Sequence, residues 1–271
     1  MACENDVARI RRYIYLLFAI VLMKDITQGR RGCACLGKPC VPGCRIPLLL
    51  LSYFLLLMQK TALLAGASGL IGTQLLPLLL ASERYAKVIV VGRKAVPVLH
   101  PKLTQVVTEL DKLQDVRLQL IADDVYCCLG TTMRQAGSKE AFYQVDYLYV
   151  VTLAALSAGN FAAQFLVVSS LGADAGARVY YSRVKGEMEA AVRQAPFRAM
   201  HIFRPSLLLG ERAQPRLGER LSAAVLGAVR PLLRGPLRKY RAVTAAAVAE
   251  AMLRAAQAES SGVRVHEAGG A

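Results

Sequence analysis

From residue 60 onward, short apolar runs alternate with longer segments of helical length. The runs are rich in β-branched side chains, and most lack the polar alternation of a strand with one face in water. Because helices separate them, they predict an α/β fold built on a doubly wound parallel sheet of about seven strands, with helices on both faces. The predicted strands are residues 60–65, 87–92, 103–107, 125–129, 164–169, 200–203 and 263–268.

Two of the intervening segments, residues 138–159 and 180–195, have helical length and composition, and Gly159 is a suitable stop for the first. A further helix should follow residue 72, and it contains Pro77. A proline inside a helix removes a hydrogen bond and crowds the preceding turn, at a cost of about 3 kcal/mol. We therefore expect Pro77 to kink this helix.

The first 58 residues do not follow this pattern. Their apolar runs, residues 13–23 and 46–58, are shorter than the roughly 18 to 20 residues that a membrane-spanning helix needs. Arginines precede the first run as in a secretory signal, but no small-x-small cleavage site follows it. This leader, residues 1–58, is either a membrane anchor or dispensable, and residues 59–271 are expected to fold and bind cofactor without it.

The chain is strongly basic, with a formal net charge of +15, and residues 204–241 hold nine Lys/Arg against two Asp/Glu. Such a surface attracts nucleic acid, an anionic membrane or a phosphorylated ligand, or is simply a solvated arginine-rich face. No interleaved aromatic residues or nucleic-acid motif accompany it, so nucleic acid is not an expected partner. We assign residues 206–241 to a small C-terminal substrate-pocket segment.

Five of the seven cysteines lie in the leader, where "CACLGKPCVPGC" could hold zinc through four thiolates. The spacing is not two CxxC pairs and no histidine is near, so no metal is expected. Cys127 and Cys128 are predicted to be small apolar strand residues. The three histidines have no metal-ligand spacing, and His201 is expected to be a strand residue rather than a catalytic base. Nothing demands an oxidising compartment.

The stretch "GASGLIG" lies between the first strand and a leucine-rich helix. In a strand-turn-helix the first glycine, Gly66, permits the tight turn, Gly69 lets backbone approach a pyrophosphate, and Gly72 lets helix and strand pack closely. The phosphates would lie at the helix N-terminus. An ordinary glycine turn is the alternative, but the strand before and the helix after favour a dinucleotide.

The second strand ends in "VVGRKAV", where an enzyme that uses NAD would carry an acid for the ribose 2′-OH. Arg93 and Lys94 can instead pair with a 2′-phosphate. We therefore expect NADP as the cofactor, with NAD as the second choice, unless both residues are only solvated surface charges. Asp111, after the third strand, either meets the adenine or is a surface acid.

The candidate for chemistry is "YYSRVK", in which Tyr181 and Lys185 are four residues apart on a helix and so share one face. A neighbouring ammonium favours the phenolate form of a tyrosine, which makes Tyr181 a plausible general acid. Ser169 and Ser170 end the fifth strand, and we select Ser170 because its position after the strand directs it into the cleft. A YxxxK motif by itself usually marks an exposed helix face. Here the motif follows the glycine turn in the chain order of a dinucleotide-binding enzyme, which favours a catalytic pair.

The ordered motifs "GASGLIG", "VGRK", "CCLGTT", "VVSSLGA", "YxxxKGEME" and "FRPSLLLG" resemble the atypical short-chain dehydrogenase/reductases, and in particular their Tat-interacting-protein-like branch, over residues 59–271. The resemblance implies a Rossmann-like NADP-binding fold with Tyr181 and Lys185 as the active-site pair and Ser170 as its serine. The expected cofactor contacts are Gly66, Ser68, Gly69, Leu70, Ile71, Gly72, Arg93, Lys94, Leu129, Gly130, Thr131, Thr132, Lys185 and Pro205. Arg204 and Pro205 match a segment that lies near the nicotinamide in related enzymes.

One departure stands out. Many short-chain dehydrogenases supply an active-site asparagine from the helix before the serine strand, but the sole asparagine beyond the leader is Asn160, too late in that helix to match. The proton relay of the family therefore lacks its asparagine in this chain.

Together these features predict an NADP-dependent oxidoreductase that transfers hydride between the nicotinamide and an unidentified carbonyl or alcohol. Tyr181 would donate the proton, Lys185 would hold the ribose, and Ser170 would stabilise developing charge. The alternative is an NAD(P)-binding regulatory or interaction module without turnover. The expected partners are a small-molecule substrate and, in the second case, a protein; the expected location is cytoplasmic, or membrane-associated if the leader is an anchor.

Overall fold

The computed structural model describes residues 59–206, 208–209 and 242–267. The predictions for the leader, including its apolar runs and its cysteine motif, lie outside the described residues. The same holds for most of the basic substrate-pocket segment. The account of the fold below concerns the described residues alone.

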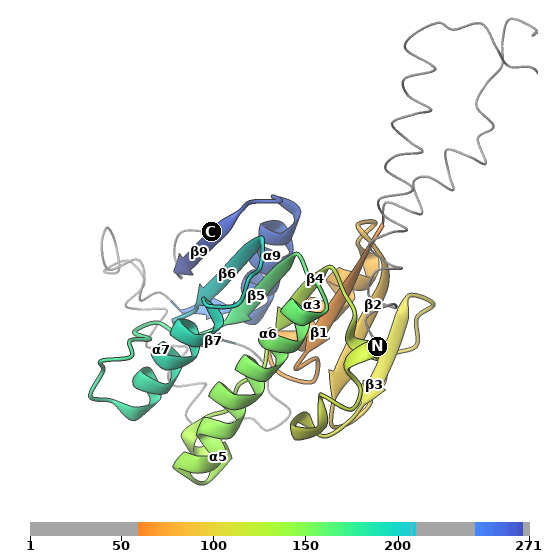
Figure 1. The fold of residues 1–271 in the computed structure, drawn as a ribbon. Helices are drawn as coiled ribbons and strands as arrows, with labels where there is room; N and C mark the ends of the chain where they lie inside the picture. Colours follow the sequence, from red (N-terminus) through yellow and green to blue (C-terminus); the bar gives the residue numbers. More distant parts are fainter. Residues whose placement is uncertain (1–58, 207, 210–241, 268–271) are drawn as a thin grey trace, which may run out of the picture. The chain divides into compact units, whose positions relative to one another are not determined.

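Seven parallel strands form the main sheet, in the order β3-β2-β1-β4-β5-β6-β9 (Figure 1). This confirms the predicted doubly wound sheet, with strand ends that differ from the prediction by up to two residues. The strands are β1 (Lys60–Ala65), β2 (Tyr85–Gly92), β3 (Leu103–Val107), β4 (Asp124–Cys127), β5 (Gln164–Val168), β6 (Ala199–Arg204) and β9 (Gly262–Glu267).

The strand order reverses between β1 and β4. From β1 the chain moves outward through β2 to β3, and then crosses to β4 and continues through β5, β6 and β9 in the other direction. Ala65, the last residue of β1, pairs with Val91 on one side and Cys127 on the other. The turns that follow these strands therefore emerge side by side at the carboxyl edge, where open α/β sheets bind ligands.

Helices cover both faces of the sheet, as predicted (Figure 1). One face carries α3 (Gly72–Ala81) and α9 (Ala245–Gln257), and the other carries α6 (Tyr149–Gly159) and α7 (Tyr180–Val192). Shorter elements complete the described part: η1 (Leu110–Lys112), η2 (Arg117–Leu120), α4 (Met133–Ala136), α5 (Lys139–Tyr143) and the π-helical turn η3 (Gln144–Leu148), which joins α5 to α6.

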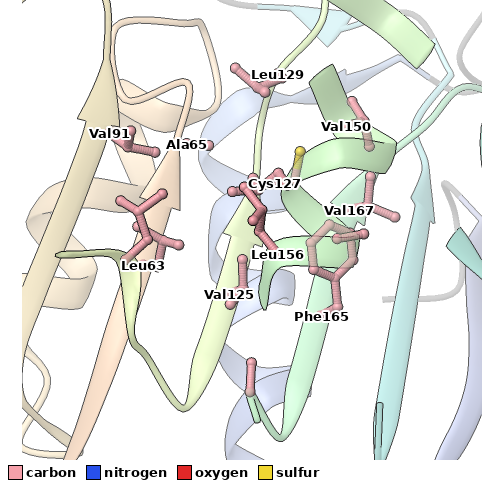
Figure 2. Close-up of a cluster of buried hydrophobic side chains, with 14 of the residues drawn as sticks. Leu63, Ala65, Val91, Val125, Cys127, Leu129, Val150, Leu156, Phe165 and Val167 are labelled. Atoms are coloured by element: carbon pink, nitrogen blue, oxygen red, sulfur yellow. The ribbon is translucent and has the colours of Figure 1, made fainter. Parts of the chain in front are cut away.

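Strands β1 to β6 contribute to two hydrophobic layers, whereas β9 is largely exposed. Leu63 points to the layer under α6, where Val125 of β4 and Phe165 of β5 lie beside Leu156 of the helix (Figure 2). Leu64, the next residue of β1, is buried in the layer under α3 and α9. Because successive side chains point to opposite faces and both faces are covered, the strands are apolar without alternation.

The segment predicted as a helix over residues 138–159 is helical throughout, with η3 at its middle. By length and composition, Lys139–Gly159 is the one described helix apolar enough to cross a membrane. A third of its apolar window is buried, and Val150, Leu153 and Leu156 of the buried part lie in the core. The helix ends at Gly159, as predicted.

Pro77 does not break α3, which continues through it for a further turn. The side chains of Pro77 and Thr73 are exposed. The carbonyl of Thr73, which would have accepted from an N–H at position 77, belongs to this exposed side of the helix, where water limits the cost of a missing bond.

Two features were missing from the sequence prediction. A short parallel pair joins β7 (Leu208–Leu209) to β8 (Val243–Thr244), and strands this short carry no periodic signal. Helix α9 follows directly and was also missed. Its start is marked by Thr244, whose side chain accepts the N–H of Ala247 as an N-cap.

Candidate functional site

The glycine turn after β1 is closed by backbone approaches that exclude side chains. Gly66 has φ of 85°, in the left-handed region, and a Cβ there would lie 2.6 Å from the carbonyl oxygen of Cys128. A Cβ on Gly72 would overlap the carbonyl oxygen of Gly66. The first and third glycines therefore fix the turn and bring α3 against it, as the motif predicted.

Gly69 is in a more open place. A Cβ there would lie 3.2 Å from the carbonyl oxygen of Gly66. The one other atom within 4 Å would be the carbonyl oxygen of Cys128. No side chain caps the start of α3 and its first turn holds no acid, so its N–H groups and positive end suit an anion. Ser68 is exposed, whereas the buried side chain of Ile71 leaves only its backbone for a cofactor.

Arg93 and Lys94 follow β2 directly and both are exposed at the same edge of the sheet. Among the residues that the structure describes, neither forms an ion pair. Arg93 is close enough to Tyr149, at the start of α6, to influence it: burial and then Asp111 raise the pKa of that phenol, and Arg93 opposes them. Asp111 therefore lies on the same side of the sheet as Arg93.

The "LGTT" turn, residues 129–132, follows β4, which ends at Cys127 and not at residue 129 as predicted. Leu129 is buried and Gly130 is exposed. The N–H of Thr131 donates to Oδ2 of Asp146 at 2.8 Å. The hydroxyl of Thr132 caps α4 by accepting the N–H of Gln135, so the two threonines have different roles.

Tyr181 and Lys185 both lie in the first half of α7. Tyr181 is half-buried, and its ring packs against Phe142 with centroids 5.4 Å apart. Lys185 is buried at 3% exposure and lies close enough to Tyr181 to interact with it electrostatically. This arrangement brings together the pair that the sequence selected.

The sequence analysis missed Asp146, the ionic partner of Lys185. Asp146 lies on η3, fully buried, with Oδ1 2.8 Å from Nζ of Lys185. Burial alone would lower the pKa of Lys185, but the carboxylate of Asp146 and then Tyr181 outweigh it, so that pKa is raised. The sequence signal that could have identified Asp146 was an acidic residue within a largely apolar helix. Asn160 lies away from this site and donates to the carbonyl of Arg117.

The two serines after β5 differ in their partners. Ser169 donates to Oε1 of Glu189 at 2.6 Å, and Arg204 holds the same carboxylate through two bonds of 2.9 and 2.7 Å. The hydroxyl of Ser170 is buried and has no partner among the described residues. Leu171 donates its N–H to the carbonyl of Pro205 at 2.9 Å, which ties the serine loop to the end of β6.

These contacts join most of the predicted residues into one region. A Cβ on Gly130 would lie 3.3 Å from Oδ1 of Asp146 and 3.6 Å from Nζ of Lys185, and Gly66 touches the backbone at Cys128. The glycine turn, the "LGTT" turn and Lys185 are therefore contiguous. Arg204 is committed to Glu189, whose hydrogen bond is the main cause of the raised pKa of Arg204.

The histidines and cysteines of the described part are structural. His201 is buried on β6, with Nδ1 2.9 Å from Nε2 of His266 and Nε2 3.2 Å from the hydroxyl of Ser260. Cys127 is a free, buried strand residue whose pKa burial raises to about 12. Cys128, also free, is half-buried just past the strand. No group of three or more metal-ligating side chains occurs in residues 59–206, 208–209 and 242–267.

Comparison with known proteins agrees with this geometry. The model of the NAD dependent epimerase/dehydratase family matches residues 62–267, and the chain belongs to that family. Among individual relatives, Protein HTATIP2 of Rattus norvegicus is 35% identical over 175 residues, covering 63% of this chain and 72% of that protein. Protein FMP52-1, mitochondrial, of Scheffersomyces stipitis is 33% identical over 172 residues, covering 61% and 75%. The resemblance to the Tat-interacting-protein-like branch is thereby confirmed.

Solved structures show the same fold at low identity. The Bordetella bronchiseptica enzyme WbmH in complex with NAD+ has a TM-score of 0.58 at 16% identity, over 77% of this chain and 76% of that one. MoeE5 in complex with UDP-glucuronic acid and NAD has a TM-score of 0.60 at 19% identity, over 77% and 76%. The chain therefore has the NAD(P)-binding fold of the epimerase/dehydratase type.

Proposed function

We propose that the protein is an NADP-dependent oxidoreductase that transfers hydride between the nicotinamide and a small carbonyl or alcohol. The observation that carries the proposal is the buried Lys185, one helical turn after Tyr181 and directly below the "LGTT" turn. A lysine buried at a sheet edge that binds ligands, beside a phenol, is arranged for chemistry rather than for solubility.

Each group has a task in the reduction. The bound nicotinamide supplies the hydride. Tyr181 donates a proton to the carbonyl oxygen, Lys185 holds the nicotinamide ribose, and the unpartnered hydroxyl of Ser170 donates a hydrogen bond to the oxygen as negative charge develops. Ser169 is unsuited to hydrogen-bonding the substrate oxygen because its hydroxyl already donates a hydrogen bond to Glu189.

The preference for NADP rests on the end of β2. Arg93 and Lys94 are exposed there, beside the glycine turn, and no carboxylate takes the place where a ribose 2′-OH would bind. A guanidinium matches a phosphate with two parallel bonds. The solved relatives named above were determined with NAD, so the two coenzymes have to be compared directly.

The first experiment identifies any nucleotide that co-purifies, by mass spectrometry, and then follows NADPH oxidation against a panel of aldehydes and ketones. Tyr181→Phe should lower turnover by at least about a hundredfold, because a proton donor is lost, and leave dinucleotide affinity within about twofold. Tyr180→Phe is the matched control, since its hydroxyl only donates to the carbonyl of Lys139. Full turnover by Tyr181→Phe would refute the assigned role.

A second candidate is a dinucleotide-dependent binding module without turnover, for which the partner would be a protein. It is favoured by the position of Asn160, which donates to the carbonyl of Arg117 and so leaves the proton relay without its asparagine. The two functions separate cleanly: a module binds coenzyme in calorimetry but oxidises no NADPH with any compound of the panel, and Tyr181→Phe leaves its partner binding unchanged.

For location, the sequence predicts the cytoplasm, or a membrane if the leader anchors the chain. The FMP52 relatives are named mitochondrial, which makes the mitochondrion the competing location. Fractionation of cells that express the full chain or a chain starting at Met58 distinguishes the three. Recovery of the full chain with mitochondria would overturn the cytoplasmic prediction.

A further inference from the structure

Asp146 is a buried carboxylate to which the roles above assign no task. Oδ2 accepts the N–H of Thr131 at 2.8 Å, whereas the buried Oδ1 accepts no hydrogen bond of good geometry among the described residues and contacts Nζ of Lys185 as an ion pair at 2.8 Å. A fully buried aspartate is rare in proteins unless it is paired, because its charge loses hydration. Its position on a π-helical turn is also notable, since such turns occur frequently at functional sites.

The "LGTT" turn covers this ion pair at close range. A Cβ on Gly130 would lie 3.3 Å from Oδ1 of Asp146 and 3.6 Å from Nζ of Lys185, so the glycine lets backbone close over both groups. The side chains of Lys185 and Asp146 are 4% and 0% exposed. With water excluded, the attraction between them is stronger than at a surface.

The carboxylate also decides the charge of the lysine. Burial acts to discharge Lys185, and the raised pKa of its ammonium shows that Asp146 prevails, with a further contribution from Tyr181. Without the carboxylate, burial would dominate and the amine would lose its proton at lower pH. Asp146 therefore controls a property of Lys185 on which the proposed chemistry depends.

We propose that Asp146 is a positioning residue, which holds Lys185 charged and fixed below the "LGTT" turn so that the ammonium serves Tyr181 and a bound nicotinamide ribose. The inference rests on the proposed function for the task of Lys185, but the ion pair exists without turnover. Asp146 comes from the helix before the serine strand, so that helix supplies a carboxylate in a chain that lacks an asparagine there.

The test uses Asp146→Asn, whose amide oxygen can still accept the N–H of Thr131 while the charge is removed. Asp174→Asn is the matched control, because Asp174 also accepts a backbone N–H, that of Gly176, but in an exposed turn. Calorimetry measures NADP affinity at about pH 6 and about pH 9. Relative to the control, Asp146→Asn should lose about tenfold more affinity at the higher pH, because its lysine discharges.

A second measurement needs neither coenzyme nor turnover: the free energy of unfolding in urea at the same two pH values. In the wild type the folded-state pKa of Lys185 lies above its unfolded value, so its contribution persists across this range and is lost only at higher pH. In Asp146→Asn the folded-state pKa should fall below the unfolded value. The deficit of the variant should therefore be large at about pH 6 and shrink toward about pH 9, whereas the deficit of Asp174→Asn stays constant.

A Lys185→Met background completes the test. There Asp146 is a buried charge without a partner, so adding Asp146→Asn should raise the urea midpoint instead of lowering it. The proposal is overturned if Asp146→Asn and Asp174→Asn show the same pH dependence, or if Asp146→Asn lowers the midpoint equally in both backgrounds. A wild type that gives no heat with either nicotinamide coenzyme would reject the proposed function instead, and leaves the urea test of Asp146 decisive.

Discussion

Gly66 and Gly69 are three residues apart in one turn, yet a methyl group would have different effects at the two positions. At Gly66 the backbone is left-handed and the carbonyl of Cys128 occupies the space of a Cβ. At Gly69 the nearest atom is a single carbonyl oxygen at 3.2 Å. The first glycine therefore serves the fold, and the second leaves room beside the start of α3.

Gly66→Ala should lower the free energy of unfolding by at least about 2 kcal/mol, because it adds backbone strain and a steric overlap. Gly69→Ala should change it by less than about 1 kcal/mol but weaken dinucleotide binding at least tenfold in calorimetry, because the methyl group intrudes where the pyrophosphate approaches. Gly137→Ala is the control for strain alone, since Gly137 also has positive φ but no atom lies within 4 Å of its Cβ position. Equal binding by Gly69→Ala and the wild type would contradict the site.

In the proposed function, Arg93 is the residue on which coenzyme choice depends. Arg93→Asp should lower NADP affinity at least tenfold and raise NAD affinity, because a carboxylate repels the 2′-phosphate and accepts bonds from a 2′-OH. Titration calorimetry with both coenzymes measures the change. Arg254→Asp, an exposed arginine of α9, should leave both affinities unchanged; an equal loss there would indicate an effect of net charge only.

Among the elements, the central strands β1, β2, β4, β5 and β6 were predictable because they are buried on both faces and therefore form largely apolar runs. The short pair of β7 and β8 was not, because its register depends on a partner distant in the chain. The same reason hid Asp146. Spacing on α7 joins Tyr181 to Lys185, whereas the partner of that lysine comes from another helix and is selected only by folding.

Helix α3 retains a local conflict that can be removed. Pro77→Ala should raise the free energy of unfolding by about 1 to 3 kcal/mol, because the new N–H can donate to the carbonyl of Thr73 and the ring no longer crowds the turn. Urea denaturation measures the gain. Pro196→Ala, an exposed proline after α7, should give no gain, and a similar rise in both variants would mean that the helix is not the cause.

In the molecule as a whole, the last strand of the sheet is held by side chains as well as by its ladder. β9 pairs only with β6 in the described part of the chain. Across this pair His266 contacts His201, and Ser260 contacts the other nitrogen of that ring. Burial, followed by His266 and Arg264, lowers the pKa of His201 to about 4, so the ring stays neutral in the folded protein.

This arrangement predicts a loss of stability in acid. Since the folded-state pKa of His201 lies below the unfolded value of about 6.5, its contribution is present above that pH and is lost as the pH falls toward about 4, by about 1 to 3 kcal/mol. His201→Gln should flatten the dependence of unfolding free energy on pH in that window, measured in urea. His100→Gln is the control, and an unchanged slope in His201→Gln would contradict the assignment.

The π-helical turn gives the length of one helix a chemical meaning. Each residue of an α-helix rotates the chain by about 100°, so deleting Tyr147 or Leu148 while α6 stays packed would swing Asp146 away from Lys185. When homologous chains are aligned, a gap of one position between this aspartate and α6 should therefore be counted as a change of the charge beside Lys185, not as neutral drift in a spacer.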